Sequence, residues 1–518
     1  MGRLKAFGVV LTILAFVIWS ASPSQGAQPQ YGGTLIYAAG ADPDSLDPPN
    51  TQSNPGEAMN RMIYENLVRF DEKLRLVPGL ATKWDLSKDG KTWTFYLRKG
   101  VKFHDGTPFN AEAVRFYFER VLGPEKPIKA PLFTPFVDRV EVVDDYTIKV
   151  HLKTPFAFFL NHIAHSAGGI ASPAALKKWG KDITLHPVGT GPFKFVEWIP
   201  GDHLTLDRNE DYWAGRPYLD RIIVRTVKED SARVLMLEAG DAHVIVRIPP
   251  EDIPRLAQGG KVKLDMGQTN RALFVGLNNL KKPFDDVRVR QALNYAIDKE
   301  AIVKNIYQGM AMVIPGPVGP LSTGYYPAKG YPYDPAKAKR LLAEAGYPNG
   351  FKASMWTPKG RYLKDFELMQ AIQQQLKEVG VETTFESMEW AAYLAITRKP
   401  PAEAKQEIFL LGWSPSTAEA RWGLYPLFHS EQWAPKGDNR WFYANKKFDE
   451  AIEKATVAID IKTRDRYLKE AQEIVIKDAP LIFLLATKEA VGMSKKVHGV
   501  INLPLELVYV DHRTWLEK

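Results

Sequence analysis

Two hydrophobic periods alternate along the chain, and they predict a mixture of strands and helices. Residues 93–97, after a turn at 89–90, alternate apolar and polar positions as a half-buried strand does. Other segments repeat apolar residues every three to four positions, which is typical of amphipathic helices. Continuous apolar runs at 408–411 and 480–485 predict strands that are buried on both faces.

Helices and strands are distributed unevenly. Strands concentrate between residues 93 and 152, whereas helices separated by single strands dominate from residue 273 onward. Asn54 is expected to be an N-cap, with Pro55 in the first turn. Further helices are expected at 110–121, 231–239, 287–297, 299–307, 335–345, 366–379, 448–458 and 463–476. The pattern indicates a mixed α/β chain with an early β-rich insertion.

The loop after the buried strand at 408–411 has the composition of a small-molecule site. It begins at Gly412 and carries two tryptophans, three hydroxyl groups and two opposite charges. Ligands of open α/β sheets lie beyond the carboxyl ends of strands, and they need aromatic walls with a few polar groups. The candidate ligand-binding residues are Trp413, Ser414, Ser416, Thr417, Glu419, Arg421 and Trp422. The alternative is a surface loop whose tryptophans only cover the core.

Five more residues are candidates for the same site. Trp390 and Tyr393 follow the predicted strand at 381–385, where they either line a cleft or pack in the core. Asn270 and Arg271 precede the strand that begins at Leu273. The Arg271 guanidinium either binds a ligand carboxylate or fixes a hinge through a salt bridge. Asp42 lies in the polar loop after the first strand.

The composition excludes several classes of protein. The chain has 518 residues and no cysteine, so disulfides, thiolate nucleophiles and cysteine-ligated metal sites are excluded. The formal net charge is +8, without a basic block, which argues against nucleic acid as a partner. The sequence contains no Walker motif, and we expect no cofactor and no metal.

The N-terminus has the pattern of a signal peptide. Arg3 and Lys5 precede an uncharged apolar segment at 6–20, which is short for a membrane span. Small residues follow, so cleavage is expected after Gly26. The segment has no cysteine for lipid attachment, which favours a secreted, unlipidated protein of a bacterial periplasm. A retained anchor is the alternative.

Several motifs in order resemble the family 5 solute-binding proteins of ABC importers, which include dipeptide, oligopeptide, nickel and glutathione receptors. The clearest is DGKTWTF, continuing through LRKGVKFHDG to FNAE, at 89–112. VGTGPF at 188–193, LDRN with DYW at 206–213, and VRVRQAL at 287–293 follow. The similarity extends from about Tyr31 to the C-terminus. The loop from Gly412 resembles that of the glutathione-type branch.

The resemblance implies a two-lobed periplasmic-binding-protein clamshell, type II-like, with a β-rich domain in the first lobe. Such a receptor is periplasmic, captures a small solute between closing lobes and delivers it to a membrane permease, and we expect a monomer. The expected parts are a signal peptide at 1–26, a discontinuous first lobe at 27–55, 187–270 and 487–518, a β-rich domain at 56–186 and a second lobe at 271–486.

The resemblance also gives two residues of the loop opposite roles. Peptide-binding relatives hold the ligand ammonium with an acid that often lies three positions after the tryptophan, where this chain has Ser416. The glutathione-type branch tends to have two acids before the next tryptophan; here Glu419 keeps the first and Arg421 replaces the second. We expect Glu419 to bind the amine of a small, peptide-like ligand and Arg421 its carboxylate. Alternatively, Arg421 points to solvent.

Two other functions fit parts of the sequence. Gly412 to Ser416 begins like the nucleophile elbow of a hydrolase, but the second glycine is absent and Pro415 lacks the backbone N–H that helps form an oxyanion hole. We therefore expect no enzyme activity, with a secreted hydrolase as the alternative. A receptor for a metal chelate is a second alternative.

Overall fold

The computed structural model describes residues 28–518. The predicted signal peptide therefore lies outside the described residues. Within 28–518, no helix is long and apolar enough to cross a membrane.

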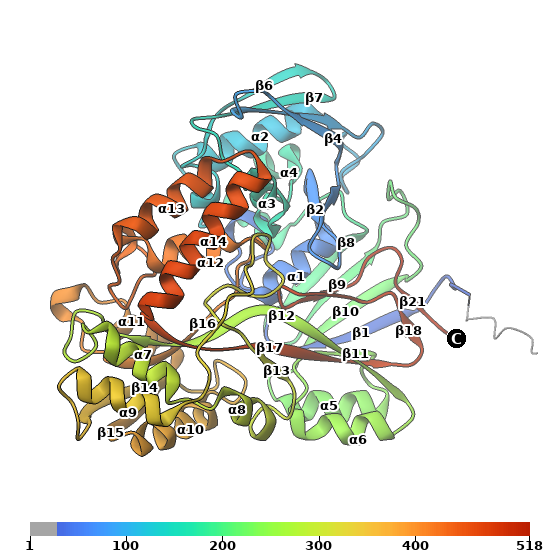
Figure 1. Ribbon diagram of the computed structural model, residues 1–518. Helices are drawn as coiled ribbons and strands as arrows, with labels where there is room; N and C mark the ends of the chain where they lie inside the picture. The colour runs from blue at the N-terminus through green and yellow to red at the C-terminus, as the bar shows by residue number, and fades with distance from the viewer. Residues whose placement is uncertain (1–27) are drawn as a thin grey trace, which may run out of the picture.

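One large mixed sheet extends through the molecule (Figure 1). Its strand order is β15-β14-β16-β12-β17-β11-β1-β10-β9-β8, and β13 pairs with β17 beside this path. The strands are β1 (Thr34–Ala39), β8 (Phe193–Ile199), β9 (His203–Arg208), β10 (Arg221–Thr226), β11 (Val244–Ile245), β12 (Val262–Leu277), β13 (Ala311–Val313), β14 (Phe351–Pro358), β15 (Val381–Met388), β16 (Ile408–Trp413) and β17 (Leu481–Ser494).

The antiparallel strands β12 and β17 join the two halves of this sheet. The start of β12 pairs with the end of β17 beside β11, whereas the end of β12 lies between β17 and β16. The register shifts between Gln268 and Ala272, where the chain passes from one half to the other. A break in the ladder bends a strand locally. The predicted lobe boundaries at 270 and 486 fall beside it and stay a prediction.

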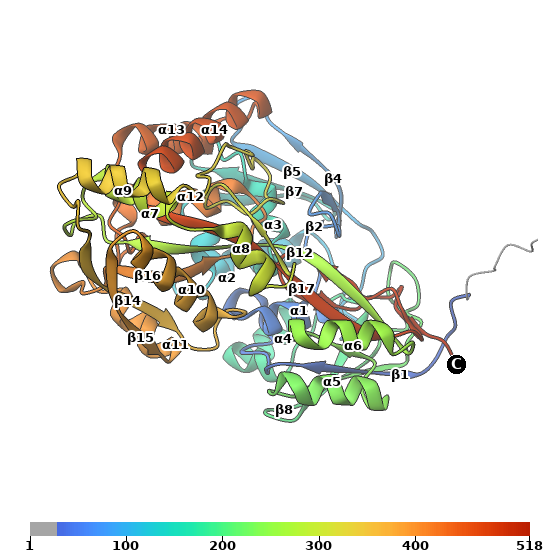
Figure 2. The ribbon, with the colours of Figure 1, turned by 60° about the horizontal axis from the view of Figure 1, so that its bottom comes forward.

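Helices cover each half separately (Figure 2). The first half carries α5 (Asp230–Ala239) and α6 (Ile253–Gln258). The second half carries α7 (Val287–Tyr295), α8 (Lys299–Asn305), α9 (Pro335–Glu344), α10 (Asp365–Glu378) and α11 (Trp390–Thr397). Buried residues of the second half form a hydrophobic cluster of their own, which includes Leu277, Leu293, Ile372 and Leu410. The helices of the first half pack on a second cluster, which includes Ala38, Val234 and Leu256, whereas the largest cluster extends through both halves.

A smaller four-stranded sheet forms the β-rich part at the top of Figure 1. Its order is β4 (Ala81–Leu86), β5 (Thr92–Leu97), β7 (Thr147–Leu152) and β6 (Val137–Asp144), with α2 (Ala111–Leu122) packed on it. In β5 the residues Trp93, Phe95 and Leu97 are buried and their neighbours are half-buried, so the predicted alternation is correct. This sheet confirms the early β-rich insertion.

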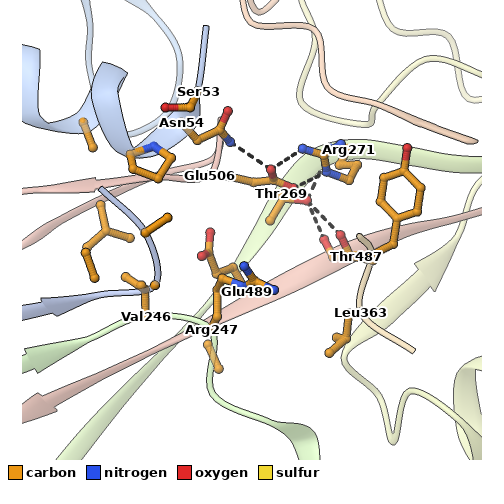
Figure 3. Close-up of a pocket in the computed structure, with 18 of the residues that line it drawn as sticks. Ser53, Asn54, Val246, Arg247, Thr269, Arg271, Leu363, Thr487, Glu489 and Glu506 are labelled. Atoms are coloured by element: carbon orange, nitrogen blue, oxygen red, sulfur yellow. Dashed lines mark hydrogen bonds and ion pairs between the residues drawn. The ribbon is translucent and has the colours of Figure 1, made fainter. Parts of the chain in front are cut away.

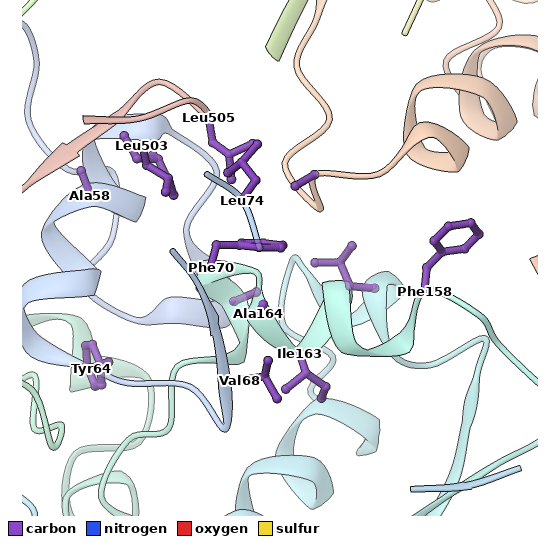
Figure 4. Packing of buried hydrophobic residues seen from close by; sticks show 14 of the residues in the cluster. Ala58, Tyr64, Val68, Phe70, Leu74, Phe158, Ile163, Ala164, Leu503 and Leu505 are labelled. Carbon is purple, nitrogen blue, oxygen red and sulfur yellow. The ribbon is translucent and has the colours of Figure 1, made fainter. Parts of the chain in front are cut away.

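Below this sheet, residues far apart in sequence share one core (Figure 4). Ala58, Phe70, Ile163 and Leu503 are all buried in it. They come from elements near both ends of the described chain, which are α1 (Asn54–Ile63), β2 (Val68–Phe70), α3 (Phe159–Ala164) and β19 (Ile501–Leu503). Five further elements of the described chain are β3 (Leu76–Pro78), α4 (Pro173–Trp179), β18 (Val497–His498), β20 (Leu507–Tyr509) and β21 (Trp515–Leu516).

The N-cap of α1 is Ser53, so the prediction of Asn54 was wrong. The Ser53 hydroxyl accepts from the Gly56 backbone N–H at 3.2 Å, the bond of an N-cap side chain. Asn54 is instead the first helical residue, and its amide donates to Glu506 Oε2 at 3.0 Å. Both residue types cap helices, and the Asn54 side chain contacts the C-terminal segment instead of capping.

Helices α12 (Ala420–Phe428), α13 (Lys446–Val457) and α14 (Ile461–Asp478) pack against the β-rich part. Asn161 Nδ2 donates to the Thr417 carbonyl at 3.0 Å, and the Ala157 backbone N–H donates to the Thr456 carbonyl at 3.0 Å. The Arg464 guanidinium lies 5.4 Å from the centre of the Phe158 ring. These contacts join the predicted β-rich domain to segments of the predicted second lobe.

Candidate functional site

A cavity of about 510 Å³ lies where the two halves of the large sheet meet. Its walls come from β1, the start of α1, the segment after β11, the crossing strands β12 and β17, the loop after β14 and the segment before β20. Ligand pockets of proteins commonly fall between about 300 and 1,000 Å³. The cavity therefore has room for a solute of a few residues, surrounded by both lobes.

One wall is held by a salt bridge at the crossing point (Figure 3). The Arg271 guanidinium binds both carboxylate oxygens of Glu506, and Asn54 donates to the same carboxylate. Burial alone raises the pKa of Glu506, but the charge of Arg271 and its hydrogen bond hold that pKa below its ordinary value. Beside them, Thr269 Oγ1 donates to the Thr487 carbonyl at 2.8 Å. Arg271 thus ties the crossing strand to the C-terminal segment, and its predicted contact with a ligand carboxylate stays a prediction.

Glu489 on β17 is the acid of the cavity wall that has a buried oxygen without a hydrogen bond in the described part of the chain. Its Oε2 is buried, and no residue within 28–518 donates a hydrogen bond to it. Desolvation and the nearby charge of Glu506 raise the pKa of Glu489 to about 7, although Arg247 and Arg271 act in the opposite direction. In Figure 3 the side chains of Glu489 and Arg247 lie together, apart from the hydrogen-bonded group around Arg271.

The loop after β14 contributes a cation and one aromatic residue, and Trp390 at the start of α11 contributes a second aromatic residue. The Arg361 guanidinium lies 5.2 Å from the centre of the Tyr362 ring and 5.1 Å from that of Trp390. Desolvation and the positive charges of Arg271 and Arg247 lower the pKa of Arg361. The Tyr362 hydroxyl accepts from the Gly412 backbone N–H at 2.9 Å, which ties this loop to the end of β16.

The structure brings two of the predicted site residues, Arg271 and Trp390, to the cavity wall. Three others lie elsewhere. Asn270 is buried and donates to Ser322 Oγ at 2.8 Å. Asp42 accepts from the Gly201 backbone N–H at 2.7 Å and from Thr226 Oγ1 at 2.8 Å, so it joins two loops. Tyr393 is fully buried and its hydroxyl donates to the Leu410 carbonyl at 2.8 Å, which is the core packing given as its alternative.

The loop from Trp413 to Trp422 does not line this cavity. The Trp413 indole N–H donates to the Trp422 carbonyl at 2.8 Å, and the Trp422 ring packs edge-on against His162 of α3 with centroids 5.9 Å apart. Ser414 and Ser416 are half-buried, and Thr417 is fully buried. The loop therefore packs against the β-rich part, and its role in ligand binding stays a prediction.

Glu419 and Arg421 make contacts within the protein. Glu419 is fully buried at the N-cap of α12, where its Oε2 accepts from the Trp422 backbone N–H at 3.0 Å. Burial raises the pKa of Glu419 to about 7, which the charge of Arg421 partly offsets. Arg421 is 6% exposed and donates to Thr456 Oγ1 at 2.8 Å. It does not point to solvent, and its guanidinium lies 4.5 Å from the centre of the Tyr425 ring.

Arg247, Arg361 and Glu489 were missed by the sequence analysis, although signals for two of them exist. Arg361 follows the carboxyl end of β14, which is the position that identified the loop after β16. Lys488 and Glu489 interrupt the apolar run of β17, and charged residues in a buried strand need a partner of opposite charge or a hydrogen bond. Arg247 carries no comparable signal, because a single arginine between apolar residues is ordinary.

Comparison with known proteins decides the family. The model of the bacterial extracellular solute-binding proteins, family 5, matches residues 75–435. The chain belongs to this family. It is 37% identical over 506 residues to a glutathione-binding protein GsiB of Pectobacterium atrosepticum, covering 97% of this chain and 96% of that protein. The expected family membership is confirmed.

Solved structures agree with the clamshell fold. A periplasmic binding protein DppA of Helicobacter pylori, in complex with the peptide STSA, matches with a TM-score of 0.79 and 32% identity over 94% of this chain and 99% of that one. HbpA2 of Haemophilus parasuis matches with a TM-score of 0.82 and 30% identity over 94% of this chain and 100% of that one. The predicted two-lobed α/β fold is confirmed.

Proposed function

We propose that this family 5 protein captures a small peptide-like solute, of the size and chemistry of glutathione, and delivers it to the membrane permease of an ABC importer. The observation that carries the proposal is a cavity of about 510 Å³ with charged and aromatic walls, which lies where the two halves of the large sheet meet. The relatives named as glutathione-binding, at 37% identity over nearly the whole chain, support the ligand class.

The chemistry of the walls supports a zwitterionic ligand. Arg361 supplies a planar donor for carboxylates, and Glu489 supplies an acceptor for an ammonium. Tyr362 and Trp390 provide apolar surface between charged groups. A peptide backbone with ionised ends presents these same groups, so the walls fit a short peptide better than a sugar or a lipid.

The ligand is bound without chemical conversion. The serine of the hydrolase-like segment, Ser414, lies outside the cavity walls, and its buried hydroxyl has no hydrogen-bond partner in the described chain. A serine nucleophile needs an adjacent general base. The predicted signal peptide and the extracellular family together support secretion to the periplasm.

Calorimetry and scattering on the mature protein, residues 27–518, test the proposal. Reduced glutathione and trialanine serve as probes. We expect saturable binding of at least one probe, a decrease in the radius of gyration, and recovery of the probe unchanged by mass spectrometry. Conversion of the probe by pure protein, lost in Ser414→Ala, would instead support the hydrolase alternative. Absence of binding by every probe at millimolar concentration would contradict the proposed ligand class.

A further inference from the structure

Two arginines face the cavity from opposite lobes. Arg247 follows β11 in the first half of the sheet, and Arg361 follows β14 in the second half. They are close enough for the charge of Arg247 to contribute to lowering the pKa of Arg361. Closure of the clamshell therefore brings two like charges toward each other.

Both arginines are exposed residues of the cavity wall, and neither forms a salt bridge within residues 28–518. In the described part of the chain, no carboxylate lies within 4.0 Å of either one, whereas Arg271 in the same cavity binds Glu506 directly. The third acid of the wall, Asp230, is already bound by Arg233 outside the cavity. The wall thus contains more uncompensated positive than negative charge.

The backbone at Arg247 is held in an unfavourable conformation. Its φ is +59°, in the left-handed region that non-glycine residues avoid, and Glu506 in the same cavity has a φ of +62°. Such backbone strain is concentrated at functional sites. Arg247 lines the cavity from this uncommon backbone conformation.

One acid among these cations has a free acceptor. Glu489 Oε2 is buried, lines the cavity and lacks a hydrogen-bond donor among residues 28–518. A ligand ammonium supplies such a donor, and it also opposes the nearby negative charge of Glu506. The cavity consequently offers two separate anion positions and one cation position.

We propose that the ligand carries two separate anionic groups, one bound by Arg247 and the other by Arg361, and an ammonium that faces Glu489. This inference rests on the proposed function and specifies its ligand. A ligand of this kind links the two lobes through one charged group each, and it removes the repulsion that opposes closure of the empty cleft. A peptide with a single carboxylate leaves one arginine uncompensated.

Matched probes separate these charges. Reduced glutathione has two carboxylates and one ammonium, its glycyl monoethyl ester has one carboxylate, and N-acetylglutathione has no ammonium. We expect calorimetry to show ester and acetyl derivatives binding about ten- to a hundredfold more weakly than glutathione, which is the effect of losing one charge-assisted hydrogen bond. Trialanine should bind as weakly as the ester.

Variants assign each charge to its residue. Arg247→Gln and Arg361→Gln should each weaken glutathione binding by about ten- to a hundredfold, and one of them should bind the ester as well as the wild type does. Glu489→Gln should reduce the preference for glutathione over N-acetylglutathione. Lys352→Gln removes a charge at a side chain that is 87% exposed and serves as the control. In scattering, Arg361→Gln should make the empty protein more compact, whereas the control should not.

The outcomes distinguish this inference from the proposed function. Equal binding of glutathione, its ester and trialanine, unchanged in both arginine variants, would overturn the two-anion ligand and leave peptide capture standing. Binding of none of the probes by the wild type would overturn both. Binding that is selective for glutathione but insensitive to both variants would place the ligand elsewhere and overturn the inference.

Discussion

Glu489 shows how one residue couples the cleft to pH. Its carboxyl group is buried beside Glu506, and its raised pKa means that the folded protein binds the proton more tightly than the unfolded chain does. The free energy of unfolding then falls as the pH rises from the ordinary value of 4.5 to about 7. The residue therefore lowers the stability of the empty protein at neutral pH.

Glu489→Gln should remove this effect because glutamine does not ionise. We expect the variant to exceed the wild type in free energy of unfolding at pH 8 by on the order of 1–3 kcal/mol, and to match it at pH 4. Urea unfolding at the two pH values measures both quantities. Glu419, whose pKa is also about 7, is unchanged in both proteins and cancels in the comparison. An identical difference at both pH values would show that Glu489 has an ordinary pKa.

At the scale of one element, α12 depends on the acid that precedes it. The Glu419 carboxylate caps the helix through the Trp422 backbone N–H inside a fully buried environment. Glu419→Ala leaves that donor without its acceptor, and we expect a loss of about 1–2 kcal/mol in the free energy of unfolding. Glu419→Gln keeps an acceptor oxygen and should lose less. Chemical denaturation of both variants gives the comparison.

The same pair of variants tests the predicted charge clamp. A ligand amine bound by Glu419 requires that Glu419→Gln weaken glutathione binding about tenfold or more with little change in stability. If Glu419 only caps the helix, Glu419→Gln should change the free energy of unfolding and leave the affinity for glutathione unchanged. The contacts of Glu419 in the structure favour the second result.

For the whole molecule, closure depends on contacts between α12–α14 and the β-rich part. Asn161 donates to the Thr417 carbonyl across this interface at 3.0 Å. Asn161→Ala removes a hydrogen bond worth about 1 kcal/mol that is made only when the two parts are together. We expect a larger radius of gyration for the empty protein and an affinity lowered about fivefold, because less of the protein is in the closed form.

Asn349→Ala is the control for this experiment, since Asn349 is exposed in the turn before β14. It should leave both the radius of gyration and the affinity unchanged. If Asn161→Ala changes the melting temperature but neither closure nor affinity, the contact stabilises the fold and does not contribute to closing the clamshell.

The sequence by itself determined the elements, the fold class and the family. The hydrophobic period predicted strand β5, the helices of the second half and the buried runs of β16 and β17. This period depends on a few neighbouring residues, so a single sequence is enough to detect it. The strand-end rule named Trp390, which lines the cavity, and Tyr393, which packs in the core. It was also applied to the loop after β16, which the structure packs against the β-rich part.

Only the tertiary structure decided which charges meet in the cleft. Arg271 and Glu506 are 235 positions apart, and Arg247 approaches Arg361 from the opposite lobe. Glu419 and Arg421 carry the two charges that a clamp for a zwitterionic ligand needs, but the β-rich part covers them. Whether a charged side chain binds the ligand or the protein depends on which distant segments surround it, and local sequence does not contain those distances.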